Sequence, residues 1–384
     1  MSVVRLPYPY TAAGLQALAD RFGSPLLVID CDIIRRQYHA LAAALPGVDL
    51  HYALKPLPDA TVVQVLAREG AWFDLATNGE VDLVRDAGID AARCIHTHPI
   101  KRDSDIRHAL DFGITTFVID NPDEIAKFAQ YRDRVRLLVR VAFRSPEAIV
   151  DLSRKFGCDA DAALDLVQRA AAADIRVSGF SFHVGSQVAR PDKYMQAIET
   201  CAGLIAESRR LGLGPIEVLD IGGGFPIDYL QPAPAISEFC APIRAALAML
   251  PAGLRTIAEP GRFICGPAGV GLTTVIGRAH RDGRWWYYLD DGLYGTFSGQ
   301  LYDHSRFPVE TVHPHDGPRL ACVLAGPTCD SIDVVAEDLP MPELAIGALL
   351  VARQFGAYTI ATATDFNLFP RARVVPVNVA PSDG

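Results

Sequence analysis

The sequence predicts an α/β fold, a closed (β/α)8 barrel followed by a second, mostly β domain. Short β-rich runs alternate with helix-like segments eight times along the first two thirds of the chain. Such alternation indicates parallel strands joined by crossover helices, and eight units of this kind close into a barrel. Beyond about residue 265 the helical periodicity ends, and strands separated by glycine and proline dominate, which is typical of a β domain.

The barrel strands are expected where short apolar runs recur between helix-like segments. These runs are residues 51–54, 72–75, 94–97, 115–119, 137–141, 177–183, 217–219 and 256–259. An amphipathic helix at 12–22 and a strand at 26–30 precede them. Further strands are expected at 269–276, 285–289, 320–325 and 348–352. We therefore expect a cofactor-binding barrel domain over 31–265, and a β domain built from 1–30 and 266–384.

Composition and charge limit the class of protein. Half of the 384 residues are hydrophobic, so the chain can bury a sizeable core. The net charge of −9, without runs of lysine or arginine, argues against a nucleic-acid partner and suits a cationic substrate. No apolar run reaches the roughly eighteen residues that a membrane span needs, and the N-terminal segment lacks a signal-peptide core, so we expect a cytoplasmic protein without membrane association. The eight cysteines lack the spacing of a metal site or a disulfide framework, so no metal is expected.

Several polar side chains are expected to meet at the mouth of the barrel, where the C-terminal ends of the strands lie. Lys55, Asp74, His183 and Glu259 fall at or just past expected strand ends, as does the glycine run at 222–224. Lys55 ends an apolar run, and a desolvated amine at that place can form a Schiff base. The alternatives are a solvated lysine at a strand end and, for His183, a satisfied core histidine.

A glycine run follows the seventh expected strand, which is the usual phosphate position in such a barrel. Gly222, Gly223 and Gly224 would let backbone N–H groups close around an anion. Ser186 could add a hydroxyl there, and Arg262 a positive charge. The alternative is a tight turn that needs positive φ. No GxxxxGK[ST] motif is present, so a nucleotide-binding P-loop is not supported.

Six motifs in a fixed order extend over nearly the whole chain. They are Tyr-Ala-Leu-Lys at 52–55, His-Val-Gly-Ser-Gln at 183–187, Asp-Ile-Gly-Gly-Gly-Phe at 220–225, Ala-Glu-Pro-Gly-Arg at 258–262, Gly-Pro-Thr-Cys-Asp at 326–330 and Gly-Ala-Tyr at 356–358. In this order they resemble the pyridoxal-phosphate-dependent decarboxylases of ornithine, lysine, arginine and diaminopimelate, which have an alanine-racemase-like barrel. Ornithine decarboxylases are the most similar of these.

The resemblance implies pyridoxal 5'-phosphate as cofactor. It implies that Lys55 anchors the cofactor, that His183 stacks on its ring, and that Glu259 pairs with the pyridine nitrogen. A glutamate there favours decarboxylation over racemisation, because alanine racemases of this fold have an arginine; the alternative for Glu259 is a structural salt bridge to Arg262. By the same resemblance, cofactor binding falls to Lys55, Asp74, Arg140, His183, Ser186, Gly222, Gly223, Gly224, Glu259, Gly261, Arg262 and Tyr358.

The resemblance also implies how the substrate is held. Cys329 would protonate the carbanion after carbon dioxide leaves, and Asp330 would help to hold the distal amine across the boundary of a homodimer with shared active sites. Tyr302 and Asp303 resemble the substrate-reading stretch of ornithine decarboxylases. Two carboxylates suit a terminal ammonium, so a basic amino acid is expected, ornithine giving putrescine or lysine giving cadaverine. Without the resemblance, Cys329 would be an inert turn residue and Asp303 a surface carboxylate.

Three positions depart from the family pattern. Pro56 and Leu57 follow the lysine where Ala-Asn is usual, and Leu368 stands where glycine is usual. All three are expected to border the pocket, so they put the substrate in question more than the reaction. The alternatives are a decarboxylase of a modified ornithine or a diaminopimelate-like substrate, an amino-acid racemase, and a non-catalytic binding protein similar to antizyme inhibitor.

Overall fold

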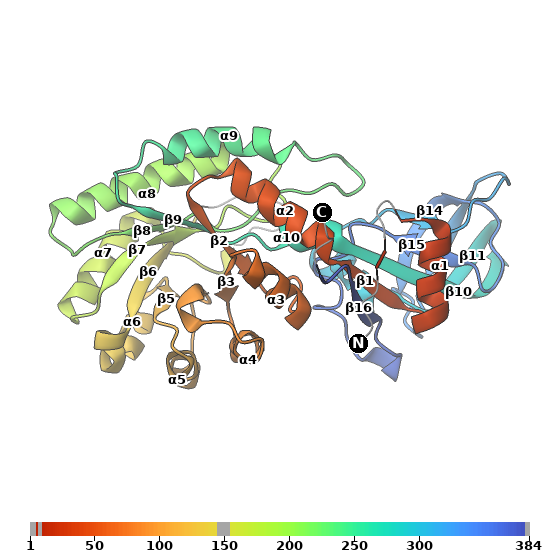
Figure 1. The fold of residues 1–384 in the computed structure, drawn as a ribbon, viewed down its shortest axis with the longest axis horizontal. Helices are drawn as coiled ribbons and strands as arrows, with labels where there is room; N and C mark the ends of the chain where they lie inside the picture. Colours follow the sequence, from red (N-terminus) through yellow and green to blue (C-terminus); the bar gives the residue numbers. More distant parts are fainter. Residues whose placement is uncertain (1–4, 7–9, 144–153, 381–384) are drawn as a thin grey trace. The chain divides into compact units, whose positions relative to one another are not determined.

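The computed structural model describes residues 5, 6, 10–143 and 154–380. The N-terminal residues on which the expected lack of a signal peptide rests lie partly outside this range. The chain divides into two compact units (Figure 1). The barrel unit comprises Arg35–Pro226 and Ala233–Phe263, and the β unit comprises Met1–Ile34, Ile227–Pro232 and Ile264–Gly384.

Eight parallel strands form a closed barrel in the order β2 to β9, which confirms the predicted fold class. They are β2 Val48–Ala53, β3 Trp72–Leu75, β4 Cys94–His96, β5 Thr116–Ile119, β6 Arg136–Val141, β7 Val177–Phe182, β8 Val218–Asp220 and β9 Arg255–Ala258. β2 begins three residues before the expected position, because Val48, Asp49 and Leu50 pair with β9 and complete the closure.

Helices α3 to α9 surround the strands of the barrel (Figure 1). They are α3 Ala60–Arg68, α4 Asn78–Asp86, α5 Asp103–Phe112, α6 Pro122–Phe128, α7 Ala160–Ala172, α8 Asp192–Arg210 and α9 Ile236–Leu247, and α2 Cys31–Ala44 precedes the first barrel strand. Polar caps fix where several of them begin. The side chains of Asp59, Thr77 and Asn121 accept hydrogen bonds from the first-turn amides of α3, α4 and α6. Among the described residues, no helix has the length and apolar character needed to cross a bilayer.

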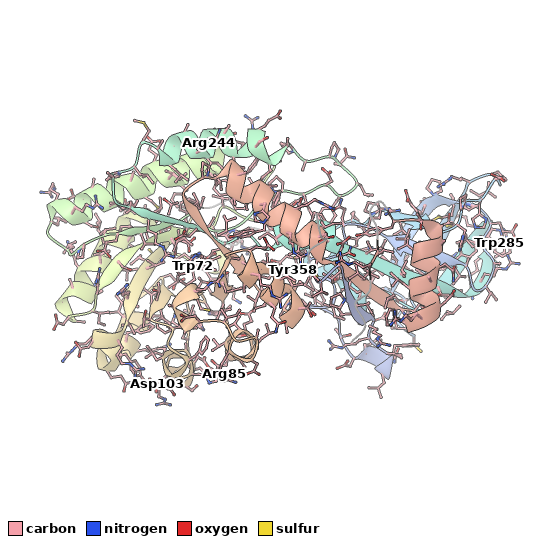
Figure 2. The ribbon with its side chains drawn as sticks, viewed as in Figure 1. Trp72, Arg85, Asp103, Arg244, Trp285 and Tyr358 are labelled. Carbon is pink, nitrogen blue, oxygen red and sulfur yellow. The ribbon has the colours of Figure 1, made fainter. Side chains whose placement is uncertain are left out.

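Packed side chains occupy the end of the barrel at which the strands begin. Trp72, labelled in Figure 2, begins β3. The guanidinium of Arg255 lies 4.3 Å from the centroid of the Trp72 ring, and its Nε lies 2.6 Å from the Asp49 carboxylate. The ring of His51, on β2, stacks on the ring of Trp72, on β3. This end is therefore structural, and the polar residues predicted to act in chemistry belong to the opposite end.

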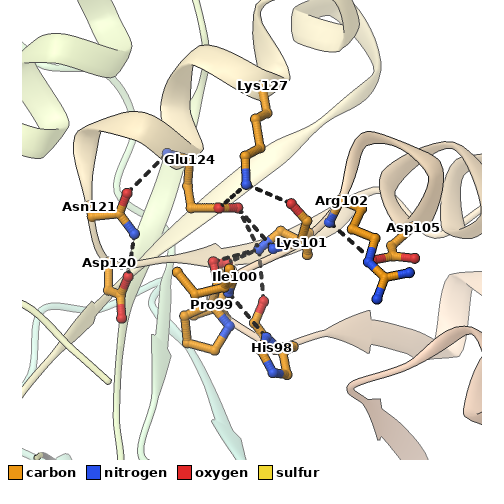
Figure 3. A network of polar contacts seen from close by, with 11 residues as sticks. His98, Pro99, Ile100, Lys101, Arg102, Asp105, Asp120, Asn121, Glu124 and Lys127 are labelled. Atoms are coloured by element: carbon orange, nitrogen blue, oxygen red, sulfur yellow. Dashed lines mark hydrogen bonds and ion pairs between the residues drawn. The ribbon is translucent and has the colours of Figure 1, made fainter. Parts of the chain in front are cut away.

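A buried lysine ties the loop after β4 to the neighbouring strand and helix (Figure 3). Lys101 is 2 % exposed, and its Nζ donates to the carbonyls of His98, Pro99 and Val118 at 2.8, 3.0 and 2.6 Å. The carboxylate of Glu124 on α6 lies 3.7 Å from the same nitrogen. Burial lowers the pKa of Lys101 to about 8, but three carbonyls and one carboxylate still compensate the charge.

The β unit is an eight-stranded sheet ordered β12-β15-β10-β11-β13-β14, with β1 beside β10 and β16 beside β1. Its strands are β1 Leu26–Asp30, β10 Gly269–Arg281, β11 Arg284–Leu289, β12 Val309–Thr311, β13 Leu320–Ala325, β14 Val334–Met341, β15 Leu349–Ala352 and β16 Arg373–Val377. The short helices α10 Arg262–Cys265 and α11 Gly299–Tyr302 connect its parts, as do 3-10 turns at Gly266–Ala268, Thr296–Ser298 and Phe366–Leu368. The described part of the barrel unit also contains 3-10 turns at Ala91–Arg93 and Ala129–Arg134.

Helix α1, Ala12–Phe22, covers one face of this sheet. Its buried residues Leu15 and Leu18 join a core of strand residues from β1, β10, β15 and β16. The core comprises Leu6, Leu15, Leu18, Leu26, Val28, Val270, Leu272, Val312, Leu349, Val351, Val375 and Val377. The apolar stripe of α1 is therefore explained by burial against the sheet.

Candidate active site

Lys55 lies just past the end of β2, between the loops that follow the two neighbouring strands. The amide of Ala53 donates to the Pro260 carbonyl at 3.2 Å, and the amide of Leu54 donates to the Asp74 carbonyl at 3.3 Å. The Lys55 side chain is exposed, contrary to the expected desolvated amine. Its charge nevertheless acts on the carboxyls at the mouth, because it lowers the pKa of both Asp74 and Glu259.

The two unusual residues after the lysine are packing residues. Pro56 is buried and Leu57 is 1 % exposed, and the Tyr52 hydroxyl donates to the Leu57 carbonyl at 3.0 Å. A Cβ added to Gly261 would lie 2.6 Å from Pro56 Cγ. The glycine at 261 therefore makes room for Pro56, which places the Lys55 turn close to the Glu-Pro-Gly-Arg stretch.

Asp74 ends β3 as a buried carboxyl, 4 % exposed. Thr97, directly after β4, donates a hydrogen bond to its Oδ1. The pKa of Asp74 is raised to about 7, first by burial and then by the neighbouring Glu259, against the lowering effects of Lys55, the Thr97 hydrogen bond and Arg140. Asp74 can therefore hold or release a proton near neutral pH.

Glu259 shares its buried surroundings with a second carboxyl, Asp220. Glu259 is 9 % exposed and Asp220 is fully buried, and the two side chains interact. Burial raises the pKa of Glu259 well above its usual range, with Asp220 as the next cause, and raises the pKa of Asp220 to about 6. Two carboxyls this close favour one shared proton over two negative charges.

Asp220 has no role in the sequence analysis, although it opens the glycine motif. Its Oδ1 accepts the Gly222 amide at 2.9 Å, whereas its Oδ2 is buried and finds no hydrogen-bond partner among the described residues. An aspartate directly before a glycine loop at a strand end is the signal that identifies it. A buried carboxyl oxygen without a donor indicates that this carboxyl retains a proton or faces one.

The cofactor-free protein should show the effect of this pair in its stability. The folded pKa of Asp220 lies above the unfolded value, so folded chains bind extra protons and stability falls as pH rises through about 6. From pH 5 to pH 8 we expect the free energy of unfolding of Asp220→Asn to rise by roughly 1 kcal/mol relative to that of the unsubstituted protein. Urea unfolding at both pH values tests this, with the exposed Asp161→Asn as control; a gap that narrows as pH rises would contradict it.

His183 follows β7 as a buried, neutral ring. It is 8 % exposed, and its Nδ1 accepts the Gly185 amide at 3.1 Å. Burial lowers its pKa well below the usual range, and the charges of Lys55 and Arg140 lower it further. Arg140, on β6, is half-buried and also lowers the pKa of the carboxyls Asp74 and Glu259. The ring is therefore an uncharged, fixed surface beside the carboxyls.

The glycine run after β8 is a backbone cradle. A Cβ at Gly222, Gly223 or Gly224 would lie 2.2, 2.5 and 2.4 Å from the carbonyl oxygens of Phe182, Glu259 and Gly185. Gly222 and Gly224 have φ of +66° and +115°. The Tyr194 hydroxyl donates to the Gly223 carbonyl at 2.7 Å, while the amides of Gly223 and Gly224 have no partner among the described residues. These amides can receive an anion.

Substituting one glycine of the cradle should separate the cost of a clash with a neighbouring carbonyl from the cost of a side chain at positive φ. We expect Gly222→Ala to lower stability by about 3 kcal/mol and to weaken phosphate-dependent cofactor binding about a hundredfold, because the methyl group meets the Phe182 carbonyl. Gly212→Ala is the matched control, since Gly212 has φ of +68° and open space around its Cβ position. It should cost only about 1 kcal/mol. Equal losses of stability and of cofactor affinity in the two variants would contradict the proposal that Gly222 is needed for close backbone approach.

Ser186 and Arg262 lie together, as the sequence analysis expected of two phosphate ligands. Arg262 Nη2 donates to Ser186 Oγ at 2.9 Å, and Arg262 is 6 % exposed. Arg262 begins α10 directly after Gly261. The barrel unit thus brings nine of the predicted residues into the loops and strand ends of one barrel mouth, with Arg140 and Gly261 beside them.

The remaining predicted residues belong to the β unit. Cys329 is exposed and Asp330 half-buried, in the loop between β13 and β14. Tyr302 is 59 % exposed, and the Asp303 carboxylate accepts the Ser305 hydroxyl at 2.6 Å. Tyr358 is half-buried with φ of +55°.

All eight cysteines are free, and the described residues hold no group of three metal-binding side chains. The polar groups at the barrel mouth are instead one lysine, buried carboxyls, one neutral histidine and a glycine cradle. This is a donor set for an organic anion with a carbonyl and a ring nitrogen.

Comparisons with known proteins identify the family to which the chain belongs. Residues 31–266 match the family described as pyridoxal-dependent decarboxylase, pyridoxal binding domain. A lysine/ornithine decarboxylase of Selenomonas ruminantium is 35 % identical over 92 % of this chain and 90 % of its own length. An ornithine decarboxylase of Caenorhabditis elegans is 34 % identical over 93 % of this chain and 87 % of its own length.

Solved structures show the same architecture. A lysine/ornithine decarboxylase of Vibrio vulnificus, complexed with putrescine, superposes with a TM-score of 0.92 at 50 % identity, over 98 % of this chain and all of its own. The arginine decarboxylase of Paramecium bursaria Chlorella virus superposes with a TM-score of 0.90 at 29 % identity, over 96 % of this chain and all of its own. The chain belongs to the family of pyridoxal-dependent decarboxylases, enzymes whose cofactor is pyridoxal phosphate.

Proposed function

We propose that this enzyme decarboxylates a basic L-amino acid, ornithine to putrescine or lysine to cadaverine. The observation that carries the proposal is the convergence of Lys55, the glycine cradle and the Asp220–Glu259 pair at one barrel mouth, in a chain of this family. Relatives that match most of the chain are lysine/ornithine and ornithine decarboxylases, and two Vibrio vulnificus structures contain putrescine and cadaverine.

The residues at the mouth fit the cofactor. The cradle amides of Gly223 and Gly224 would hold its phosphate, with Ser186, Arg262 and Tyr358 as further ligands. Glu259 would face the ring nitrogen, with the buried carboxyl of Asp220 beside it. When bound, pyridoxal phosphate supplies a sink for the electrons that remain at Cα as carbon dioxide departs.

The chain's own side chains position the reactants and handle protons. Lys55 would provide the amine that holds the cofactor. The carboxyl of Glu259, whose pKa burial and Asp220 raise, would pair with the ring nitrogen of the bound cofactor and share its proton. The neutral ring of His183 offers a flat face without competing charge. Asp74, poised near neutral pH, supports the charge of Lys55.

Substrate recognition is proposed for the β unit. Asp330 and Asp303 would bind the distal ammonium, with Tyr302 beside them, and Cys329 would deliver a proton to Cα. A homodimer with shared active sites and a cytoplasmic location are part of this proposal. They rest on the family resemblance and on the sequence.

Carbon dioxide release from ornithine, lysine, arginine and diaminopimelate, each offered separately to the cofactor-loaded protein, tests the proposal. We expect release from ornithine and lysine at rates at least a hundredfold above those for the other two, because the paired carboxylates favour a terminal ammonium. Lys55→Ala should abolish release from all four. Exchange of the Cα proton without carbon dioxide release would instead indicate a racemase, and release from diaminopimelate alone would contradict the substrate class.

A further inference from the structure

The loop that carries Cys329 and Asp330 is built around one buried carboxylate. Asp333 is 2 % exposed and accepts hydrogen bonds from the Leu293 amide at 2.7 Å, the Thr328 amide at 3.1 Å and the Thr328 hydroxyl at 2.7 Å. A Cβ at Gly292 or Gly326 would lie 2.3 or 2.2 Å from its carboxylate oxygens. The base of the loop is therefore closely packed against the segment that begins at Leu293.

That segment contains Tyr294, whose hydroxyl reaches the loop. Tyr294 donates to Asp330 Oδ2 at 2.5 Å, and the Ile332 amide donates to Asp330 Oδ1 at 3.2 Å. The Tyr294 hydrogen bond is the main cause that lowers the pKa of Asp330, and it raises the pKa of Tyr294 to about 12. Asp330 is thus held as a carboxylate with one lone pair on each oxygen already engaged.

Tyr294 is itself fixed on two sides. Its ring stacks on Phe366 with centroids 4.3 Å apart and an angle of 24°. Its carbonyl accepts the Thr364 amide at 2.8 Å and the Thr364 hydroxyl at 3.2 Å. The Tyr294 hydroxyl therefore points to Asp330 from a ring that is already held in place. Forming this hydrogen bond does not require further ordering of the Tyr294 side chain.

Cys329 has a separate support. Its amide donates to the side-chain oxygen of Asn367 at 3.0 Å. The two neighbouring loop residues therefore depend on different partners, Cys329 on Asn367 and Asp330 on Tyr294. A change at Tyr294 can act on Asp330 without moving the thiol.

We propose that Tyr294 is a positioning residue that orients the Asp330 carboxylate toward the distal ammonium of the substrate, an inference that rests on the proposed function. With one lone pair of Oδ2 occupied by the phenol and one of Oδ1 by the Ile332 amide, the remaining lone pairs define one direction for the ammonium. Selectivity for substrates with a terminal ammonium then depends on the phenol as well as on the carboxylate.

Tyr294→Phe is the direct test, because it removes only the hydroxyl and keeps the stack on Phe366. In the cofactor-loaded enzyme we expect KM for ornithine and lysine to rise about tenfold while kcat changes less than about threefold. Calorimetry supplies a second readout, namely the affinity for putrescine divided by the affinity for butylamine, which lacks the distal ammonium. This ratio should fall about tenfold in Tyr294→Phe.

Two further variants separate positioning from stability. Tyr287→Phe removes a hydroxyl that accepts the Leu344 amide at 3.0 Å in the same unit, so it should lower Tm and leave KM and the amine ratio unchanged. Asp330→Asn should lower the ratio, and adding Tyr294→Phe to it should produce little further change, because both act on one interaction.

The outcomes distinguish this inference from the function on which it rests. An unsubstituted enzyme that releases no carbon dioxide from ornithine or lysine overturns both. An active enzyme in which Tyr294→Phe leaves KM and the amine ratio within twofold overturns the inference alone. Additive effects of Tyr294→Phe and Asp330→Asn, or an equal fall in the ratio for Tyr287→Phe, also overturn it.

Discussion

Glu259→Gln should lower kcat for decarboxylation by about a hundred- to ten-thousand-fold while leaving the protein folded. Glutamine keeps the shape of the side chain and still forms hydrogen bonds, but its neutral amide cannot stabilise a protonated ring nitrogen as a carboxylate would. Burial and Asp220 both raise the pKa of Glu259, so the group is adapted to hold a proton that a surface glutamate would release. Single-turnover measurement of carbon dioxide release isolates this step from product release.

Glu124→Gln is the matched control for this substitution. Glu124 is also buried, 2 % exposed, but it lies on α6 and pairs with Lys101 and Lys127 in the network of Figure 3. Its substitution leaves the buried ammonium of Lys101 and the half-buried ammonium of Lys127 with less compensation, so it should lower Tm with little change in kcat. A Glu259→Gln enzyme within tenfold of the unsubstituted rate would show that ring protonation does not depend on this carboxyl.

Cys329→Ala should reduce diamine formation about a hundred- to ten-thousand-fold, because a positioned acid contributes a factor of this size to a proton transfer. Cys329 is exposed, and its amide is held by Asn367, so the thiol is presented without being buried. We expect the diamine yield to fall further than carbon dioxide release, since protonation at Cα follows departure of carbon dioxide. Parallel quantification of both products measures the difference.

Cys329→Ser tests whether the reaction depends on the acidity of the thiol or only on the size of the side chain. A hydroxyl is a far weaker acid than a thiol, so the serine variant should be nearly as impaired as the alanine variant despite its similar size. The seven other cysteines are buried or half-buried, so they cannot replace Cys329 without local opening. Equal activities of the Cys329→Ser variant and the unsubstituted enzyme would show that the thiol takes no part in the reaction.

The barrel was predictable because each of its strands is a short apolar run between amphipathic helices. The strands β12, β14 and β16 escaped the sequence analysis for different reasons. β12 spans only three residues, and β14 contains Asp338 at positive φ and Pro340, so neither shows the usual pattern. β16 is recognisable only through its parallel pairing with β1, more than three hundred residues away.

The site was predictable to the extent that its residues stand next to strand ends or within motifs. Lys55, Glu259 and the glycine cradle are of this kind. Tyr294 could not be found in that way, because its role depends on the stack with Phe366 and on the turn that faces Asp330. The exposure of Lys55 was also unpredictable, since an apolar run before a lysine fixes the burial of the strand but not that of its last side chain.

Borohydride reduction of the cofactor-loaded enzyme, followed by peptide mass spectrometry, tests the central claim most directly. The chain contains five lysines, at positions 55, 101, 127, 155 and 193, so the assignment is unambiguous. We expect the pyridoxyl group on Lys55 alone, because Lys55 lies beside Asp74 and Glu259 at the barrel mouth, whereas Lys101 is occupied by three carbonyls. The label on another lysine, or no label after reduction, would contradict the account.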